Sequence, residues 1–169
     1  MDKYVDKFVI TEATYTHSGS PKKLIFDINK FAKFKDKIIY IVVDKPPPDL
    51  LKIDESDSLN RRRSKMTINA KKRETYQINM VQNAITKANP DDMIIISDLD
   101  EIPNLEKINF GIIGQRLIFF KQKMFYYKLN LFHKSLPWYG SKACKKKYFK
   151  TPEWLRSTKN KKYPVWRLD

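Results

Sequence analysis

The sequence predicts an α/β sandwich in which a mostly parallel central sheet is flanked by helices. Two β-prone apolar stretches, VDKFVITEA (5–13) and KIIYIVVD (37–44), precede a segment with helical periodicity over residues 68–88. A further apolar run, MIIIS (93–97), follows that segment after a short turn. Strands joined by helical crossovers are typical of parallel sheets covered by helices. The length of 169 residues fits one domain with its own core, so we expect a single domain over residues 1–169.

The segments around the first two strands carry strong breaking signals. Gly19 and Pro21 predict a loop over residues 17–23. Each of the three consecutive prolines at 46–48 fixes φ and removes a backbone donor. Residues 46–65 are therefore expected to form a long surface loop.

The expected helix over residues 68–88 has one continuous face and a clear end. Residues spaced by three or four positions share a face of a helix. This face comprises Gln77, Met80, Val81, Ala84, Ile85 and Ala88. The Asn89-Pro90 step ends the helix. Because residues 93–97 show no alternation of apolar and polar side chains, the strand that follows is expected to be buried on both faces.

The second half of the chain predicts further short elements. Pro103 suits the first turn of a helix over residues 103–109. LIFF (117–120) and MFYYKLNLF (124–132) are expected to be strands, the second with apolar and polar residues in alternation. The residues after Pro137 are basic and aromatic and show only weak periodicity.

The composition predicts a soluble globule. A net charge of +15 fits nucleic acid, anionic membranes or phosphorylated ligands as partners, but lysines occur in nearly every segment, so a general compositional bias explains it better. The single Cys144 excludes an intrachain disulfide, and with two histidines it excludes the usual structural zinc sites. No stretch reaches the roughly 20 apolar residues of a membrane span. We expect a cytoplasmic or viral-factory-like compartment rather than secretion.

An acidic cluster follows the most hydrophobic strand in the sequence DLDEIP (98–103). In an extended chain, Asp98 and Asp100 point the same way, and two such carboxylates repel each other unless a cation lies between them. Mg²⁺ and Mn²⁺ prefer oxygen ligands and often combine one or two carboxylates with a substrate diphosphate. The cluster therefore predicts a divalent metal site, and the alternative is an acidic turn before a helix.

Two metal chemistries use Asp-x-Asp at the end of a strand. Phosphatases with an aspartate nucleophile require a Thr or Val in the place that Ile102 takes, and their motif ends the first strand of the fold. Nucleotide-sugar transferases carry the motif later in the chain, where a metal bridges the carboxylate and the donor diphosphate. The second chemistry fits this sequence better.

Six blocks of the sequence resemble a known family. They are VDKFVITEATYTHSGSPKKLIF, KIIYIVVD, RETYQIN, DDMIIISDLDEIP, KQKMFYYKLNLF and WYGSKA, in that order. Together they resemble glycosyltransferase family 17, whose reference member adds N-acetylglucosamine to a β-mannose of N-glycans. The resemblance implies a GT-A-like nucleotide-diphosphosugar transferase fold and a divalent metal, usually Mn²⁺. It also implies a UDP-sugar donor, with N-acetylglucosamine as the sugar, and inverting transfer to a glycan or glycoprotein acceptor.

The resemblance also implies site residues. Asp98 and Asp100 belong to the metal and donor site, with Asp100 as the direct ligand, and Glu101 beside them orients the donor sugar or the acceptor. The remaining matched positions are assigned to binding of the nucleotide donor. They are Thr11 and Glu12, which end the first strand and would border the nucleotide, and Glu74 and Gln77, which share a face of the helix before the motif. Members of the family usually extend further at both ends, so the chain is expected to be short at both, and transfer would be lost if those segments are essential.

Inverting transfer also needs cations for the leaving group and a base for the acceptor. Arg73 and the run Arg61–Arg63 are candidate phosphate contacts, although a run of arginines in a loop is more often solvated. The carboxylates after the motif that could act as the base are Glu106, Glu153 and Asp169. Glu153 is the candidate because it lies next to Trp154, and a helix-start charge after Pro152 is the alternative. His133 is a candidate metal ligand or a structural histidine. Trp138 and Tyr139 are either an acceptor platform or part of the core.

A different class of function is a nucleic-acid-binding domain without enzymatic activity. The net charge and the basic region from Lys142 to Lys147, with its neighbouring aromatic residues, favour it. It leaves the acidic cluster unexplained, because that cluster would repel phosphate without a metal. We therefore expect no specific nucleic-acid partner.

Overall fold

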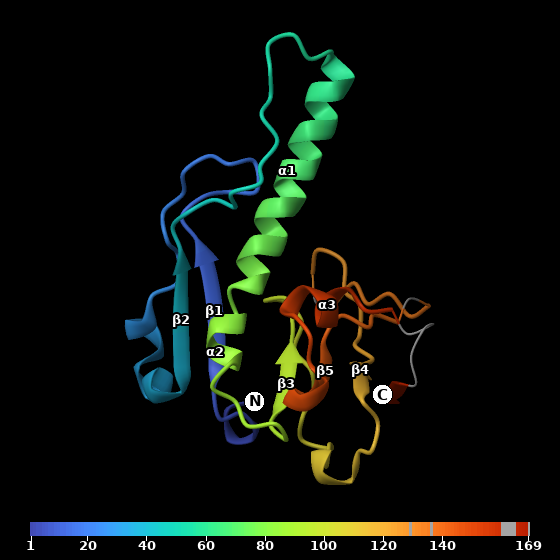
Figure 1. Cartoon of the computed structure of the whole chain (residues 1–169). Coiled ribbons are helices and arrows are strands. Elements are labelled where there is room, and N and C mark those ends of the chain that lie inside the picture. The colour runs from blue at the N-terminus through green and yellow to red at the C-terminus, as the bar shows by residue number, and fades with distance from the viewer. Residues whose placement is uncertain (129, 136, 160–164, 169) are drawn as a thin grey trace. The chain divides into compact units, whose positions relative to one another are not determined.

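The computed structural model describes residues 1–128, 130–135, 137–159 and 165–168 (Figure 1). The chain divides into two compact units. The first unit is formed by Tyr4–Ala84 with Asp2, and the second by Ile85–Asp169 with Met1 and Lys3. The α/β class is confirmed, since both units combine helices with strands. That the two units form one domain stays a prediction.

The first unit is built on a pair of parallel strands. Strand β1 (Phe8–Ala13) pairs with β2 (Ile38–Val43) from Phe8↔Ile38 to Ala13↔Val43. Both strands were predicted from their runs of β-branched residues. Short 3₁₀ helices at Asp2–Tyr4 and Ile28–Lys37 precede the two strands. Helix α1 (Leu59–Asn79) follows, with the single-turn α2 (Gln82–Ile85) after it.

Helix α1 begins earlier than the periodicity predicted. The Ser58 side chain accepts a hydrogen bond from the backbone N–H of Arg61, which caps the helix, so residues 59–65 are helical rather than part of a loop. The amino-terminal half of α1 extends beyond the two strands together with the loop that precedes it (Figure 1). The carboxyl-terminal half packs through Tyr76 and Met80 on a core of Ala13, Tyr15 and Val43.

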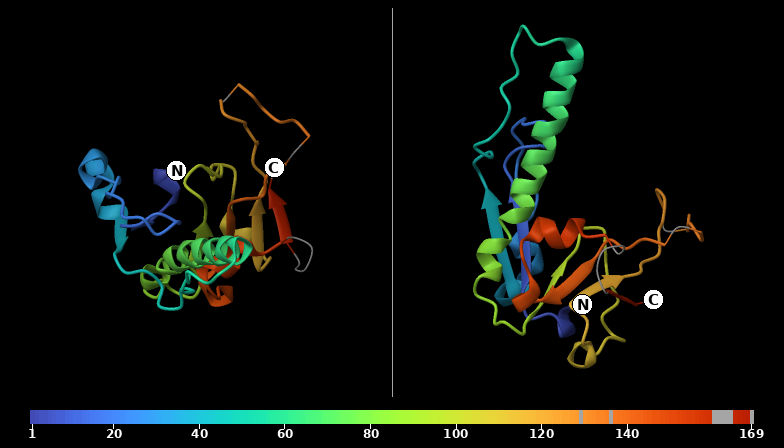
Figure 2. Two further views of the ribbon diagram at one scale, coloured as in Figure 1. Left: turned by 90° about the horizontal axis from the view of Figure 1, so that it is seen from above. Right: turned by 45° about the vertical axis from the view of Figure 1, so that its right-hand side comes forward.

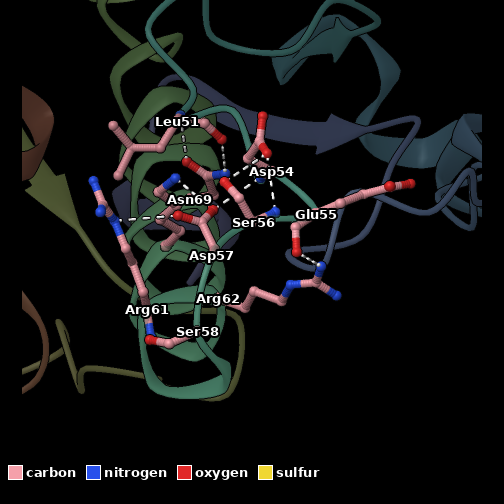
Figure 3. Close-up of polar contacts among 10 residues, drawn as sticks. Leu51, Asp54, Glu55, Ser56, Asp57, Ser58, Arg61, Arg62 and Asn69 are labelled. Atoms are coloured by element: carbon pink, nitrogen blue, oxygen red, sulfur yellow. Dashed lines mark hydrogen bonds and ion pairs between the residues drawn. The ribbon is translucent and has the colours of Figure 1, made fainter.

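Two buried polar side chains fasten that preceding loop to α1 (Figure 3). Asn69 is 5% exposed, and its amide accepts from the Leu51 N–H and donates to the Leu51 carbonyl, both at 2.8 Å. The Asp57 carboxylate forms ion pairs with Lys65 Nζ at 2.5 Å and with Arg61 Nε at 3.1 Å, and it accepts a hydrogen bond from the Asp54 N–H at 2.8 Å. The loop is thus ordered by specific polar contacts, in spite of its prolines.

The second unit contains a four-stranded mixed sheet in the order β3-β5-β4-β6. Its strands are β3 (Met93–Ile96), β4 (Leu117–Phe120), β5 (Lys142–Lys145) and β6 (Val165–Leu168). Strand β5 is antiparallel to both β3 and β4, and only the β4–β6 pair is parallel. The prediction of a mostly parallel central sheet is therefore wrong for this sheet.

Strand β5 explains the difference, because it comes from the basic segment in which no element was predicted. It lies between β3 and β4, so β3 becomes an edge strand of the described sheet, and its residues are half-buried rather than buried on both faces. Helix α3 (Pro152–Ser157) packs against this sheet through Leu155, beside Leu117, Phe119 and Cys144.

Two other predicted elements of this half are wrong. Residues 103–109, all of them described, contain no helix, and a short 3₁₀ helix follows at Phe110–Ile112. The segment 124–132, apart from Leu129, which lies outside the described residues, is a hairpin rather than one strand. Phe125 bridges Phe132, and Tyr127 has a positive φ of 58° where the chain reverses. The hairpin projects from the sheet of its unit (Figure 2).

The one thiol of the chain is buried in the core of the second unit. Cys144 is free and 1% exposed, and burial raises the pKa of its thiol to about 12. None of the described helices is long and apolar enough to cross a bilayer.

Candidate functional site

The acidic motif forms a closed turn directly after β3. The Glu101 N–H donates to the Asp98 carbonyl at 3.1 Å, and the Asp98 N–H donates to Glu101 Oε2 at 3.0 Å. Because residues 99 and 100 lie in the turn, the extended geometry expected for the motif is wrong. Asp98 is half-buried, whereas Asp100 and the 99% exposed Leu99 project into solvent.

Asp98 forms a two-point ion pair with an arginine of α3. Arg156 Nε donates to Asp98 Oδ1 and Arg156 Nη2 to Asp98 Oδ2, both at 2.8 Å. Charge-assisted pairs of this geometry are strong and orient both groups. Sequence reasoning missed Arg156, because 58 positions separate it from Asp98, and its place in a short helix after Pro152 was the only signal.

Glu101 is held by a tryptophan from the segment before β5. Trp138 Nε1–H donates to Glu101 Oε1 at 2.6 Å, so each carboxylate oxygen of Glu101 accepts one N–H. A Cβ at Gly140 would lie 1.7 Å from Glu101 Oε1 and 2.3 Å from Trp138 Nε1. Only glycine therefore leaves room at position 140 for this contact.

A buried lysine lies behind these groups. Lys142 is 8% exposed, and its ammonium donates to the Gly140 carbonyl at 3.2 Å and to the Arg156 carbonyl. Burial lowers the pKa of Lys142, while the nearby charges of Glu101, Asp98 and Glu153 act in the opposite direction. Lys142 thus fixes the end of α3 against the start of β5 and offsets part of the negative charge.

Glu153 lies in the first turn of α3, one turn before Arg156. Thr151 caps this helix by accepting from the Trp154 N–H at 3.0 Å, and Pro152 occupies the first helical position. A carboxylate at this place interacts favourably with the helix dipole, as the alternative interpretation expected. The role of Glu153 as a base stays a prediction.

The predicted metal ligands differ in their surroundings. Both oxygens of Asp98 are bonded to Arg156, and His133 lies in the hairpin, 3.4 Å from Ser135 Oγ and against the Tyr126 ring at 5.5 Å. Within the described ranges, no three His, Cys, Asp or Glu side chains gather to hold a metal. The exposed Asp100 suits a cation that takes one protein carboxylate and completes its shell with diphosphate and water oxygens. The metal roles of Asp98, Asp100 and His133 stay predictions.

In the first unit, Glu12 is the centre of a hydrogen-bond network. It accepts from Lys22 Nζ at 2.6 Å, the Ile25 N–H at 2.8 Å, the Phe26 N–H at 3.0 Å and the Tyr40 hydroxyl at 2.8 Å. Burial alone would raise the pKa of Glu12, but these bonds outweigh it and lower the pKa to about 2. The network fastens the segment after the 17–23 loop to the β1–β2 pair.

The other residues assigned to nucleotide binding also make contacts within the first unit. Gln77 Nε2 donates to the Thr11 carbonyl at 3.2 Å, and Glu74 pairs with Lys71 at 3.3 Å. Arg73 donates to the His17 carbonyl at 3.0 Å and lies against Gly19, where a Cβ would approach Arg73 Nη2 to 2.6 Å. These contacts account for the residue types structurally, and their donor-binding roles stay predictions.

The basic region favoured by the nucleic-acid alternative has local partners. Lys145 and Lys147 pair with Asp91 at 3.1 and 2.7 Å, and Lys142 is buried. Arg61 is likewise paired with Asp57. Pairing and burial thus account for Lys142, Lys145 and Lys147 within their own unit.

Comparisons with known proteins identify the family of the chain but do not address its individual site residues. Searches of curated proteins and of solved structures found no match. The match to the family described as glycosyltransferase family 17 covers residues 1–159, which contain Asp98, Asp100, Glu101 and Glu153. The chain belongs to glycosyltransferase family 17.

Proposed function

We propose that this chain is a metal-dependent inverting glycosyltransferase that moves N-acetylglucosamine from a UDP-sugar to a hydroxyl group of a glycan acceptor. Family membership supports sugar transfer in general. The observation that supports a metal-dependent transfer from a nucleotide donor is the turn after β3. There Asp100 is exposed, and the neighbouring Asp98 is bonded to Arg156.

The donor end of the site consists of Asp100 and Arg156. Asp100 would hold the divalent cation, Mn²⁺ or Mg²⁺, and the cation would supply positive charge that stabilises the leaving diphosphate. Asp98 holds Arg156 in place through their ion pair at the end of β3. In this proposal the guanidinium of Arg156 also contacts the diphosphate oxygens. This division of labour gives the two aspartates of the motif different tasks.

The acceptor end requires a base. In a single displacement, the acceptor oxygen forms a bond to the anomeric carbon while the bond from that carbon to the UDP oxygen breaks with its electron pair. The hydroxyl proton passes to a carboxylate, and we assign this role to Glu153, whose charge acts on the same buried Lys142 as those of Asp98 and Glu101.

A transfer assay tests the proposal. The intact chain is incubated with UDP-N-acetylglucosamine, Mn²⁺ and N-glycan acceptors, and the release of UDP is measured. Asp100→Ala is expected to lower the rate by at least about 100-fold, because charge on the leaving group is then unbalanced. The matched control is Asp91→Ala, an exposed acid of the same unit that pairs with Lys145 and Lys147, which should leave the rate unchanged. Equal rates for wild type and Asp100→Ala would contradict the proposal.

A further inference from the structure

The structure separates the two neighbouring aromatic residues Trp138 and Tyr139. Tyr139 packs against the core cluster of Leu117, Phe119, Cys144 and Leu155. Trp138, in contrast, is 43% exposed. The two side chains thus have different tasks, and only that of Tyr139 is explained by the core.

Trp138 is held in place although it is exposed. Its backbone exchanges two hydrogen bonds with Gln122, at 2.8 and 3.2 Å, and its ring N–H donates to Glu101 at 2.6 Å. Gly140 leaves the space in which the indole edge meets that carboxylate. Backbone, ring edge and neighbouring glycine together fix the orientation of the indole.

An exposed and immobilised tryptophan is unfavourable for a domain by itself. Fixing the ring costs side-chain entropy, and its apolar surface stays in contact with water. A purely structural tryptophan would gain more by burial. An indole fixed in this way is suited to a ligand that stacks on its face.

The surroundings of the ring select the chemistry of that ligand. One face of a pyranose carries C–H groups with partial positive charge, which complement the negative face of an indole. The Glu101 carboxylate at the ring edge has two oxygens with further acceptor capacity, so it can also accept sugar hydroxyl groups. The same carboxylate repels a phosphorylated ligand.

From these contacts we propose that Trp138 is the platform on which a neutral pyranose ring of the acceptor stacks, with Glu101 as the residue that positions it. That the bound sugar is an acceptor rests on the proposed glycosyltransferase function. The binding of a neutral sugar to Trp138 does not depend on catalysis. A sugar platform explains three residue types together, namely Trp at position 138, Gly at position 140 and Glu at position 101.

Binding of oligosaccharides to the intact chain tests this platform. Neutral manno- and chito-oligosaccharides are titrated by calorimetry, and UDP with Mn²⁺ is titrated separately. Trp138→Ala is expected to weaken oligosaccharide binding by at least about tenfold, which corresponds to the loss of one stacked ring, and to change UDP affinity less than twofold. Tyr127→Ala, which removes a 99% exposed aromatic of the hairpin, is the matched control and should change neither.

Two further variants show whether Trp138→Ala weakens binding simply because the chain no longer folds. Trp138→Phe keeps an aromatic face without the ring N–H, and Glu101→Gln keeps the shape without the charge. Both are expected to weaken oligosaccharide binding less than Trp138→Ala does, while their circular dichroism stays unchanged. Glu101→Gln also broadens the distribution of orientations of the Trp138 indole, which tryptophan fluorescence anisotropy detects once the signal of the other two tryptophans, measured in Trp138→Ala, is subtracted.

The outcomes separate this inference from the proposed function. Oligosaccharide binding that depends on Trp138, without any binding of UDP, supports the platform and contradicts the donor assignment. Loss of UDP affinity in Trp138→Ala with oligosaccharide affinity retained overturns the platform, and so does a wild-type chain that binds no oligosaccharide of the panel.

Discussion

Asp98 has both carboxylate oxygens bonded to the guanidinium of Arg156, and this single pair changes the interpretation of the motif. The sequence predicted that both carboxylates face one cation, with Asp100 as the direct ligand. In the structure one aspartate orients an arginine, and the other is exposed. Because both side chains of the pair are partly exposed, it contributes little to stability and more to the positioning of charge.

The variant Asp98→Asn tests this reading of the pair. Loss of the charge frees Arg156 to move, so transfer should fall by about tenfold or more, while the free energy of unfolding falls by less than about 1 kcal/mol. Enzyme kinetics and urea denaturation measure the two effects. The control Asp91→Asn changes an exposed carboxylate of the same unit that pairs with lysines instead of an arginine. Equal loss of activity in both variants would show that ion pairing in general, rather than the position of Arg156, matters.

Glu12 gives a prediction for the dependence of stability on pH. Its pKa is lowered to about 2 in the folded chain against 4.5 as the ordinary value, so its stabilisation is complete above the ordinary value and is lost as the pH falls toward 2. Glu12→Gln should reduce the free energy of unfolding at pH 7 by about 2 kcal/mol and by much less near pH 2. Urea denaturation at pH 2.5, 4 and 7 measures this. A difference between variant and wild type that stays constant over this range would refute the role of Glu12.

Elements were predictable where the signal lay in one run of residues. Strands β1, β2, β3 and β4 were found because each is a run of β-prone apolar residues. Strand β5 has the sequence KACK, and it is a strand because it pairs on both sides with β3 and β4, which local sequence does not encode. The hairpin was missed because alternation continues through a reversal at Tyr127, a residue that rarely adopts positive φ.

The same distinction holds for the candidate site. The positions of the acidic motif after a strand and of Glu153 near a helix start could be predicted, because both are visible in the sequence, and their roles stay predictions. Arg156 and Lys142 could not be found, because their importance arises from contacts between distant segments, including Asp98 with Arg156. The different surroundings of Trp138 and Tyr139 could not be predicted either, because they depend on how the core packs around Tyr139.

The connection between α1 and its preceding loop gives a prediction at the scale of elements. Asn69→Ala removes both bonds to Leu51 and leaves the Leu51 N–H and carbonyl without their partner. The free energy of unfolding should fall by about 2 kcal/mol, and amide hydrogen exchange at Leu51 should accelerate. Thr67→Ala, at an exposed position of the same helix, is the control and should change neither. Unchanged exchange at Leu51 in Asn69→Ala would mean that other contacts hold the loop.

At the scale of the whole molecule, the family match extends over residues of both units. The residues assigned to the metal and the acceptor lie in the second unit, and those that the resemblance assigns to the nucleotide lie partly in the first. The chain has a net charge of +15, which suits an anionic ligand such as a nucleotide diphosphate that binds at the acidic turn through a cation. The central claim is therefore that a metal links Asp100 to a nucleotide diphosphate.

Calorimetric titration of UDP into the intact chain, with and without Mn²⁺, tests that claim most directly. We predict that Mn²⁺ increases UDP affinity by at least about tenfold in the wild type and in Asp91→Ala, and that Asp100→Ala abolishes this increase. A UDP affinity that is the same with and without Mn²⁺, or an increase that persists in Asp100→Ala, would contradict the account.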